Sequence, residues 1–230
     1  YYYCVRMHGA EDTADQVVVL AMDDAAIQRI VPWDWPRGIH AYLLELLKDT
    51  RVVCVDLTFA SAQYTDNDTA LGEAIERHGR VVLSGKIVFH RDETGETIQG
   101  IEIPIHDLLA GNPGLGFVNM ATDSDDIVRR PSLVDVNLMD IPIPSLALAV
   151  VMAAEDLTLD DLKLGSGWLE AGKHRIPINK ENRALATFYG PMHTFKTISY
   201  ADVIDGAVKP EYFKDKIGII GHETAEDRSL

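Results

Sequence analysis

VVVLAMDD, at positions 17–24, is a valine-rich apolar run that stops at two adjacent acids. Such an unbroken run is typical of a strand that is buried on both faces of a parallel sheet. VVCV at positions 52–55 repeats the pattern and stops at Asp56, and residues 39–47 between the two runs carry apolar side chains at helical spacing. This stretch therefore predicts a β-α-β unit whose two strands pair in parallel through a right-handed crossover.

The alternation of strands and helices continues along the chain. A helix that ends at Gly79 is expected next, with Asp66 or Asp68 able to cap its start, and a strand follows at residues 81–83. The later elements expected are strands at 115–118 and 216–221, a helix from Pro144 to about 154, and a short helix at 200–204 that Ser199 can cap.

The pattern is weaker after Lys86. Residues 87–89 can extend the preceding strand, residues 98–105 can return antiparallel to it, and residues 162–178 look like one or two hairpins. We find no internal repeat and no Ser/Pro-rich linker that would divide the chain. The sequence therefore predicts a single α/β domain over residues 1–230, with a mostly parallel sheet flanked by helices and an irregular antiparallel or hairpin insertion.

The composition excludes several classes of protein. Of the 230 residues, 47% are hydrophobic, which is too many for an intrinsically disordered chain. The 36 acidic residues outnumber the 21 basic ones and give a formal net charge of -15. Because the field around such a molecule is negative, we expect no nucleic-acid partner and no binding to anionic lipid headgroups.

The longest apolar stretch and the two cysteines support only limited predictions. The longest apolar stretch, residues 141–154, contains Pro142 and Pro144 and is shorter than the roughly 18 residues that a membrane-spanning helix needs. Cys4 and Cys54 are too few for a disulfide framework, and whether they form one bridge stays open. Cys54 lies inside an apolar run and is most simply a small buried residue.

Acidic residues follow both of the first two predicted strands. Because ligands gather at the carboxyl ends of the strands in an open parallel sheet, Asp23, Asp24 and Asp56 could converge into a ligand site. Asp23 and Asp56 are also the candidates for a hard cation such as Mg²⁺ or Ca²⁺. The competing interpretation, which stays open, is that these acids are turn or cap residues where the chain reaches solvent.

Arg37 completes the candidate site, because it is placed in the first turn of the helix that starts beside the first strand. It could bind an anionic ligand together with nearby backbone N–H groups. It could equally form a structural ion pair with Asp56 that holds the loops together, and both roles stay open.

The common catalytic and cofactor motifs are missing from the sequence. Only one helix fits between Asp24 and Asp56, which is too little for a phosphorylation receiver domain. Residues 79–86 have the wrong glycine spacing for a phosphate-binding loop, and no GxSxG elbow or HExxH pair occurs. The eight histidines are scattered, so each is read as a surface or satisfied core residue, and no cofactor is expected.

Several short motifs, in their order along the chain, resemble the CHASE2 family of extracytoplasmic sensor domains. The first apolar strand ending in Asp23 is one of them. The others are WDWPR at 33–37, VVCVDLTF at 52–59, DTAL at 68–71, GFVN at 116–119 followed by Asp123, Asp125, Arg129 and Arg130, PSLALA at 144–149, and the closing stretches 199–206 and 213–221. This sequence differs from the family pattern after the last strand, where His222 stands in place of a small residue.

The resemblance implies a sensory input domain of a bacterial transmembrane receptor, whose cytoplasmic output is a nucleotide cyclase, a histidine kinase or a Ser/Thr kinase. It implies that the domain lies outside the cytoplasm, that it meets the membrane only through flanking segments, and that residues 1–15 are a juxtamembrane lead-in. An unidentified small molecule or ion would be the cue, the domain itself would not be an enzyme, and a homodimer is possible.

Two alternatives belong to other functional classes. A cation-dependent hydrolase would use the same carboxylates to hold Mg²⁺, and it requires their oxygens to lie within a few ångströms of a common point. A ligand-free dimerising spacer is the other, and it predicts that the domain has no cavity with convergent polar groups.

Overall fold

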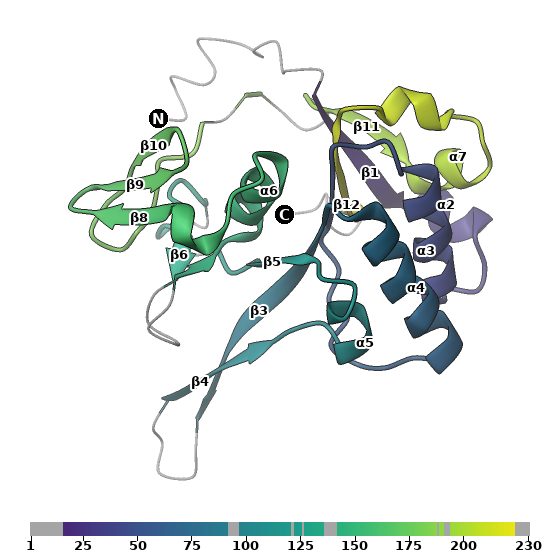
Figure 1. Cartoon of the computed structure of the whole chain (residues 1–230), viewed down its shortest axis with the longest axis horizontal. Helices are drawn as coiled ribbons and strands as arrows, with labels where there is room; N and C mark the ends of the chain where they lie inside the picture. Colours follow the sequence, from purple (N-terminus) through teal and green to yellow (C-terminus); the bar gives the residue numbers. More distant parts are fainter. Residues whose placement is uncertain are drawn as a thin grey trace.

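A mostly parallel sheet forms the centre of the molecule (Figure 1). The computed structural model describes residues 16–91, 97–120, 122–125, 127–135, 142–187, 189–190 and 194–223. The seven strands of the sheet run in the order β11-β1-β12-β2-β3-β4, and β5 also pairs with β3. Their bounds are β1 Val17–Asp23, β2 Val52–Val55, β3 Val81–Arg91, β4 Thr97–Glu102, β5 Gly114–Phe117, β11 Lys196–Ser199 and β12 Ile217–Glu223.

The predicted pairing of the first two strands is wrong in one respect. β1 and β2 are both strands of the parallel sheet, but β12 lies between them and pairs in parallel with each. The closing strand can occupy this central position because it is apolar on both faces: Ile220 packs into one core, and Ile217 and Ile219 pack into the other. The remaining pairings are parallel except β3 with β4, which is antiparallel.

Helices cover both faces of the sheet, as the α/β prediction requires. Successive residues of β2 alternate between the two cores, since Val53 and Val55 face the larger one and Val52 and Cys54 the smaller one. The larger core is covered by α2 Asp24–Arg29, α3 Arg37–Leu46, α4 Thr65–His78, α5 His106–Leu109 and α7 Tyr200–Ile204, and the smaller one by α6 Leu146–Ala154. Figure 1 shows α6 on the opposite side of the sheet from α2, α3 and α4.

Three predicted helix starts differ from the structure. Neither Asp66 nor Asp68 caps α4, which begins at Thr65, and the Asp68 carboxylate turns inward instead. Pro144 belongs to the short strand β7 Ile143–Pro144, and Ser145 caps α6 by accepting a hydrogen bond from the backbone N–H of Leu148.

Ser199 likewise makes no side-chain cap at α7. Its hydroxyl lies 2.9 Å from Asp23 Oδ1, to which it donates a hydrogen bond. Asp68 and Ser199 are thus each drawn to a tertiary partner instead of capping a helix, and at α6 the neighbouring Ser145 takes the first position predicted for Pro144.

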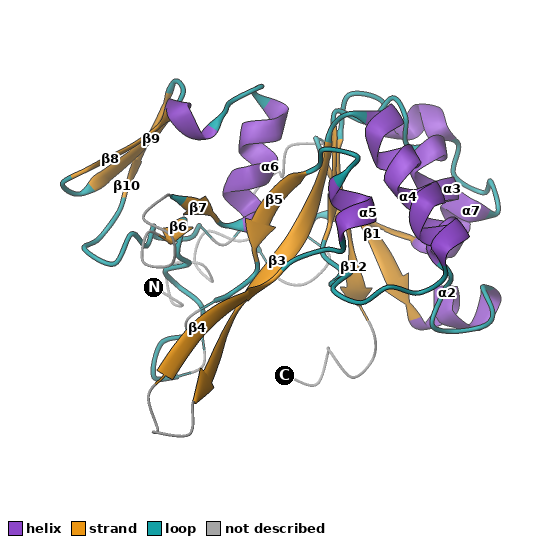
Figure 2. Ribbon diagram, turned by 60° about the horizontal axis from the view of Figure 1, so that its bottom comes forward, coloured by secondary structure: helices purple, strands orange, loops and turns teal. Residues whose placement is uncertain are grey.

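The predicted hairpin insertion is confirmed. β8 Leu162–Gly165, β9 Trp168–Ala171 and β10 His174–Pro177 form a separate antiparallel sheet, and Gly172 makes the turn before β10 with a φ of 57°. β6 Val134–Asp135 pairs with β7 beside it, and short 3-10 helices span η1 Leu159–Asp161 and η2 Pro210–Phe213. β3 and β4 extend away from the body of the molecule as a two-stranded ribbon (Figure 2).

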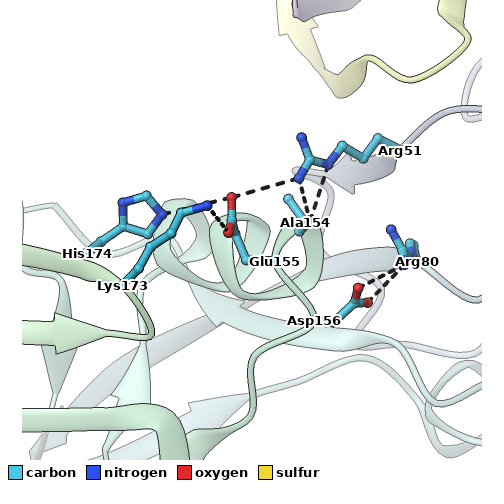
Figure 3. Close-up of polar contacts among 7 residues, drawn as sticks. All are labelled: Arg51, Arg80, Ala154, Glu155, Asp156, Lys173 and His174. Atoms are coloured by element: carbon cyan, nitrogen blue, oxygen red, sulfur yellow. Dashed lines mark hydrogen bonds and ion pairs between the residues drawn. The ribbon is translucent and has the colours of Figure 1, made fainter.

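A polar junction connects the small antiparallel sheet to the central one through the end of α6 (Figure 3). Arg51 caps the helix by donating to the carbonyl oxygen of Ala154 from Nε and Nη2, at 3.2 and 2.8 Å. Glu155 accepts a charge-assisted hydrogen bond from Lys173 at 2.8 Å, and Arg51 and His174 lie farther from it, at 3.8 and 3.9 Å. The hydrogen bond from Lys173 holds the pKa of Glu155 below its usual value.

Gly116 allows α6 to approach β5 closely. A Cβ at this position would lie 2.5 Å from Leu146 Cα and 2.7 Å from the carbonyl oxygen of Ser145. Because backbone atoms cannot move aside as a side chain can, we expect Gly116→Ala to lower the free energy of unfolding by about 1–3 kcal/mol. Chemical denaturation measures the change.

The control for this prediction is Gly114→Ala in the same strand. A Cβ there would meet the Val82 side chain at 3.1 Å, and a side chain can rotate. We expect a smaller loss from this variant, and equal losses at the two positions would contradict the close-approach explanation.

Two other predictions concern the cysteines and the absence of a membrane-spanning helix. Cys54 is a buried free thiol, and its burial raises its pKa to about 12, whereas Cys4 lies outside the described residues. Within the described part of the chain, no helix has the length and apolar character needed to cross a membrane.

Candidate functional site

A cleft of about 530 Å³ opens at the carboxyl ends of the parallel strands. Its walls come from Met22 at the end of β1, His222 at the end of β12, residues 57–63 after β2, and residues 33–35 between α2 and α3. Arg37 and His40 of α3 and Glu102 of β4 also line it. We call this feature the carboxyl-edge cleft, and it lies where the sequence predicted ligands to gather.

Asp23 lies beside this edge in a structural role. Its Oδ1 accepts hydrogen bonds from the backbone N–H of Ala26, at 2.7 Å, and from the hydroxyl of Ser199, at 2.9 Å. The carboxylate thereby caps α2 and joins β1 to the end of β11. Asp24 is exposed in the first turn of α2 and, like Asp23, is not among the residues that line the cleft.

Asp56 follows β2, next to β12 on the side away from β1. Its backbone N–H donates to the carbonyl oxygen of Ile220, and its Cβ lies near Gly221. Desolvation by the surrounding protein raises the pKa of its carboxyl, and nearby His222 partly opposes that shift. Asp56 itself is not among the residues that line the cleft, whereas His222 is.

The two metal candidates are not brought to a common point. β12 separates the strands that carry Asp23 and Asp56, which places those strands about 10 Å apart at a spacing of about 4.8 Å per strand. The Asp23 carboxylate bonds to Ser199 at the end of β11, on the far side of β1 from Asp56. Among the described residues, no group of three or more His, Cys, Asp and Glu side chains could hold a metal ion.

Arg37 forms a buried ion pair, but with a different partner from the predicted one. Its Nη1 lies 2.6 Å from Asp68 Oδ1, and both side chains are about 97% shielded from solvent, at 3% and 2% exposure. Its Nη2 donates to the carbonyl oxygen of Ser61. The predicted pair with Asp56 is therefore wrong, because α4 packs beside α3 and presents Asp68 to the start of that helix.

The Arg37–Asp68 pair also orders the wall of the cleft. Asp68 Oδ2 accepts the backbone N–H of Gln63 at 3.0 Å, and Gln63 Oε1 accepts the backbone N–H of Arg37 at 3.2 Å. The guanidinium lies over the ring of Phe59, 5.1 Å from its centroid. Together with the hydrogen bond from Arg37 to the Ser61 carbonyl, these contacts hold residues 59–63 against the starts of α3 and α4.

A chain of aromatic rings leads from the mouth of the cleft into the core. Trp33 packs edge-on against Trp35, and Trp35 lies 4.7 Å from the fully buried ring of Tyr200. The hydroxyl of Tyr200 lies 3.0 Å from His40 Nδ1. Burial, with smaller contributions from Arg37 and His222, lowers the pKa of His40 to about 4, so this histidine is a neutral, satisfied core residue near pH 7.

The tryptophans, His222 and Asp68 are the parts of the site that reasoning about strand ends missed. A sequence signal was present for Trp33 and Trp35, because they flank Asp34 in the motif WDWP directly before a predicted helix. Helix-end chemistry did not distinguish Asp68 from Asp66, because both suit the first turn of a helix equally well, and only the DTAL motif at 68–71 singled out Asp68.

A second hollow of about 760 Å³ lies on the other side of the molecule, between α6 and the strands β3 and β5. Its lining is largely apolar, with Ile87, Leu115, Phe117 and Met152 among its residues. The ion pair between Arg80 and Asp156, at 2.9 Å, borders it (Figure 3). None of the predicted site residues lies there.

Comparison with known proteins identifies the family. A family model described as the CHASE2 domain matches residues 2–229. No curated protein and no solved structure matches the chain. The predicted resemblance is confirmed, and the α/β architecture expected from it is observed. Since the match spans essentially the whole sequence, the chain belongs to the CHASE2 family of extracytoplasmic sensor domains.

Proposed function

We propose that this CHASE2 domain is the ligand-sensing input of a bacterial transmembrane receptor and that the carboxyl-edge cleft is where its cue binds. The observation that carries the proposal is the cleft itself, which combines aromatic walls with polar and charged groups at the strand ends. Cavities of about 300–1,000 Å³ with a few convergent polar groups are the usual form of small-molecule sites. A ligand-free spacer has no need of such a cavity.

The position of the cleft suggests how binding could be transmitted. Met22 and His222 come from β1 and β12, neighbouring strands that pair along seven residues. The loop at 33–35 joins α2, which directly follows β1, to α3, and the segment at 57–63 joins β2, the other neighbour of β12, to α4. A cue that prefers one arrangement of these segments shifts the population toward it, and that shift is the signal.

The remaining parts of the proposal follow from the family. The domain lies on the extracytoplasmic side, its membrane attachment is through segments that flank it, and its output is a nucleotide cyclase, a histidine kinase or a Ser/Thr kinase. Catalysis belongs to that output, and the proposed partners of this domain are a small-molecule or ionic cue and a second copy in a homodimer.

A thermal-shift screen of small metabolites and divalent ions on the 230-residue chain tests the cleft as the binding site. A cue must raise the melting temperature, because a ligand present at 100 times its Kd stabilises the native state by about 2.7 kcal/mol. Ala62→Trp places a bulky side chain in the lining of the cleft and should abolish the shift.

Ala207→Trp is the matched control, since Ala207 is exposed and is not in the lining. It should leave the ligand-induced shift unchanged. A compound that stabilises the Ala62→Trp chain as well as the original would place the site elsewhere, and no stabilisation from the whole screen would contradict a sensing role for the cleft.

A further inference from the structure

The mouth of the carboxyl-edge cleft contains an aromatic corner. The ring of Trp33 is nearly perpendicular to that of Trp35, at 87° with centroids 5.0 Å apart, and to that of His222, at 85° and 5.6 Å. Trp33 is 42% exposed although it contacts both rings, so part of its indole is available to a ligand. Faces of aromatic rings are what surround alkylammonium groups in aromatic cages.

Two carboxylates line the same cleft without a cationic partner among the described residues. Asp34 lies between the two tryptophans in the sequence and Glu102 ends β4, and both residues are exposed. Within the described part of the chain, neither forms an ion pair. Lys86 is opposite Glu102 in the β3–β4 register, but it forms no ion pair with that carboxylate and does not line the cleft.

The positive charge at the cleft is already compensated. The guanidinium of Arg37 is held by the buried carboxylate of Asp68 and by the carbonyl oxygen of Ser61. His40 is neutral near pH 7, because burial lowers its pKa to about 4. Once Arg37 and Asp68 cancel, Asp34 and Glu102 leave the lining negative, in a chain whose formal net charge is -15.

We propose that the carboxyl-edge cleft binds a small organic cation, a quaternary or protonated amine, with its charged group between the ring of Trp33 and the carboxylates of Asp34 and Glu102. The aromatic corner supplies the face that attracts an alkylammonium ion, and the unpaired carboxylates supply the countercharge. This inference rests on the proposed ligand-binding role of the same cleft and adds the chemical class of the cue.

Isothermal titration calorimetry of the 230-residue chain with choline tests the proposal, and the neutral isostere 3,3-dimethyl-1-butanol and acetate serve as comparison ligands. We expect choline to bind about tenfold more tightly than the isostere, because the two differ mainly in charge. Acetate should give no heat of binding.

The double variant Asp34→Asn/Glu102→Gln keeps the shape of the cleft and removes its charge, so the preference for choline over the isostere should fall to about twofold or less. Glu76→Gln, an exposed carboxylate on α4 outside the cleft, should leave the preference unchanged. Trp33→Leu should weaken choline binding by about tenfold.

Equal binding of choline and its isostere, tighter binding of acetate, or no binding of choline at millimolar concentration would overturn the proposal. The thermal-shift screen tests the proposed sensing function separately. If a neutral or anionic compound from the thermal-shift screen stabilises the chain and Ala62→Trp abolishes that effect, the cleft is a sensor site but not a cation site.

Discussion

Replacement of Asp68 by alanine is expected to lower the free energy of unfolding by about 3–5 kcal/mol, the largest effect of any single substitution considered for this chain. The reason is that Arg37 would keep its charge in a position that is only 3% exposed and would lose the carboxylate 2.6 Å away. The backbone N–H of Gln63 would lose its acceptor as well. Equilibrium unfolding in urea measures the loss as a lower midpoint at an unchanged m-value.

Asp66→Ala is the matched control, because Asp66 is exposed in the same first turn of α4. It should cost less than about 1 kcal/mol, the usual scale of a helix-dipole contact. Replacement of both partners, as Arg37→Met/Asp68→Leu, should be far less harmful than the sum of the single changes, since no buried charge is left unpaired. A loss below 1 kcal/mol for Asp68→Ala would contradict the assigned role of the pair.

The second large effect is a loss of stability on mild acidification, with His40 as its main source. The pKa of His40 is about 4 in the folded chain and near 6.5 in an unfolded one. Between these values the unfolded state binds the proton and the folded state does not, so the free energy of unfolding falls as the pH is lowered from about 6.5 to about 4. A shift of this size corresponds to roughly 3 kcal/mol.

His40→Gln removes the titrating group, so its unfolding free energy should depend less on pH than that of the original chain over this range. His78→Gln is needed beside it, because burial also lowers the pKa of His78 and gives a slope of the same sign. His106→Gln is the exposed control, with a side chain that is 93% accessible, and should behave as the original. If the His40→Gln and original curves stay parallel from pH 6.5 to 4, the assignment is wrong.

Local sequence patterns predicted the secondary structure of this chain well where a strand is buried on both faces or where a helix has a clear apolar face. The runs at 17–22, 52–55 and 81–83 are strands, and the spacing at 39–47 is the helix α3, because backbone preference and hydrophobic period act within a few residues. The order of strands could not be predicted in the same way. Any of several apolar runs suits the centre of the sheet, and only the packing of both cores placed β12 between β1 and β2.

The candidate site was likewise predictable only in part from the sequence. The sequence placed Asp23, Asp24 and Asp56 at one edge of the sheet, since parallel strands share their carboxyl ends, and a cleft lies beside that edge. It could not show that Asp23 would cap α2 or that Arg37 would pair with Asp68, because the partners in these contacts are chosen by how helices and loops pack.

Sequence alone therefore determined the α/β class, the acidic strand ends and membership of the CHASE2 family, all of which depend on short-range order along the chain. Tertiary structure alone decided which charges cancel. By burying Asp68 against Arg37 and leaving Asp34 and Glu102 in the lining of the same cleft as Trp33, it set the electrostatic character of the cleft. Charge compensation depends on distances of a few ångströms between residues far apart in sequence, and the fold is what creates those distances.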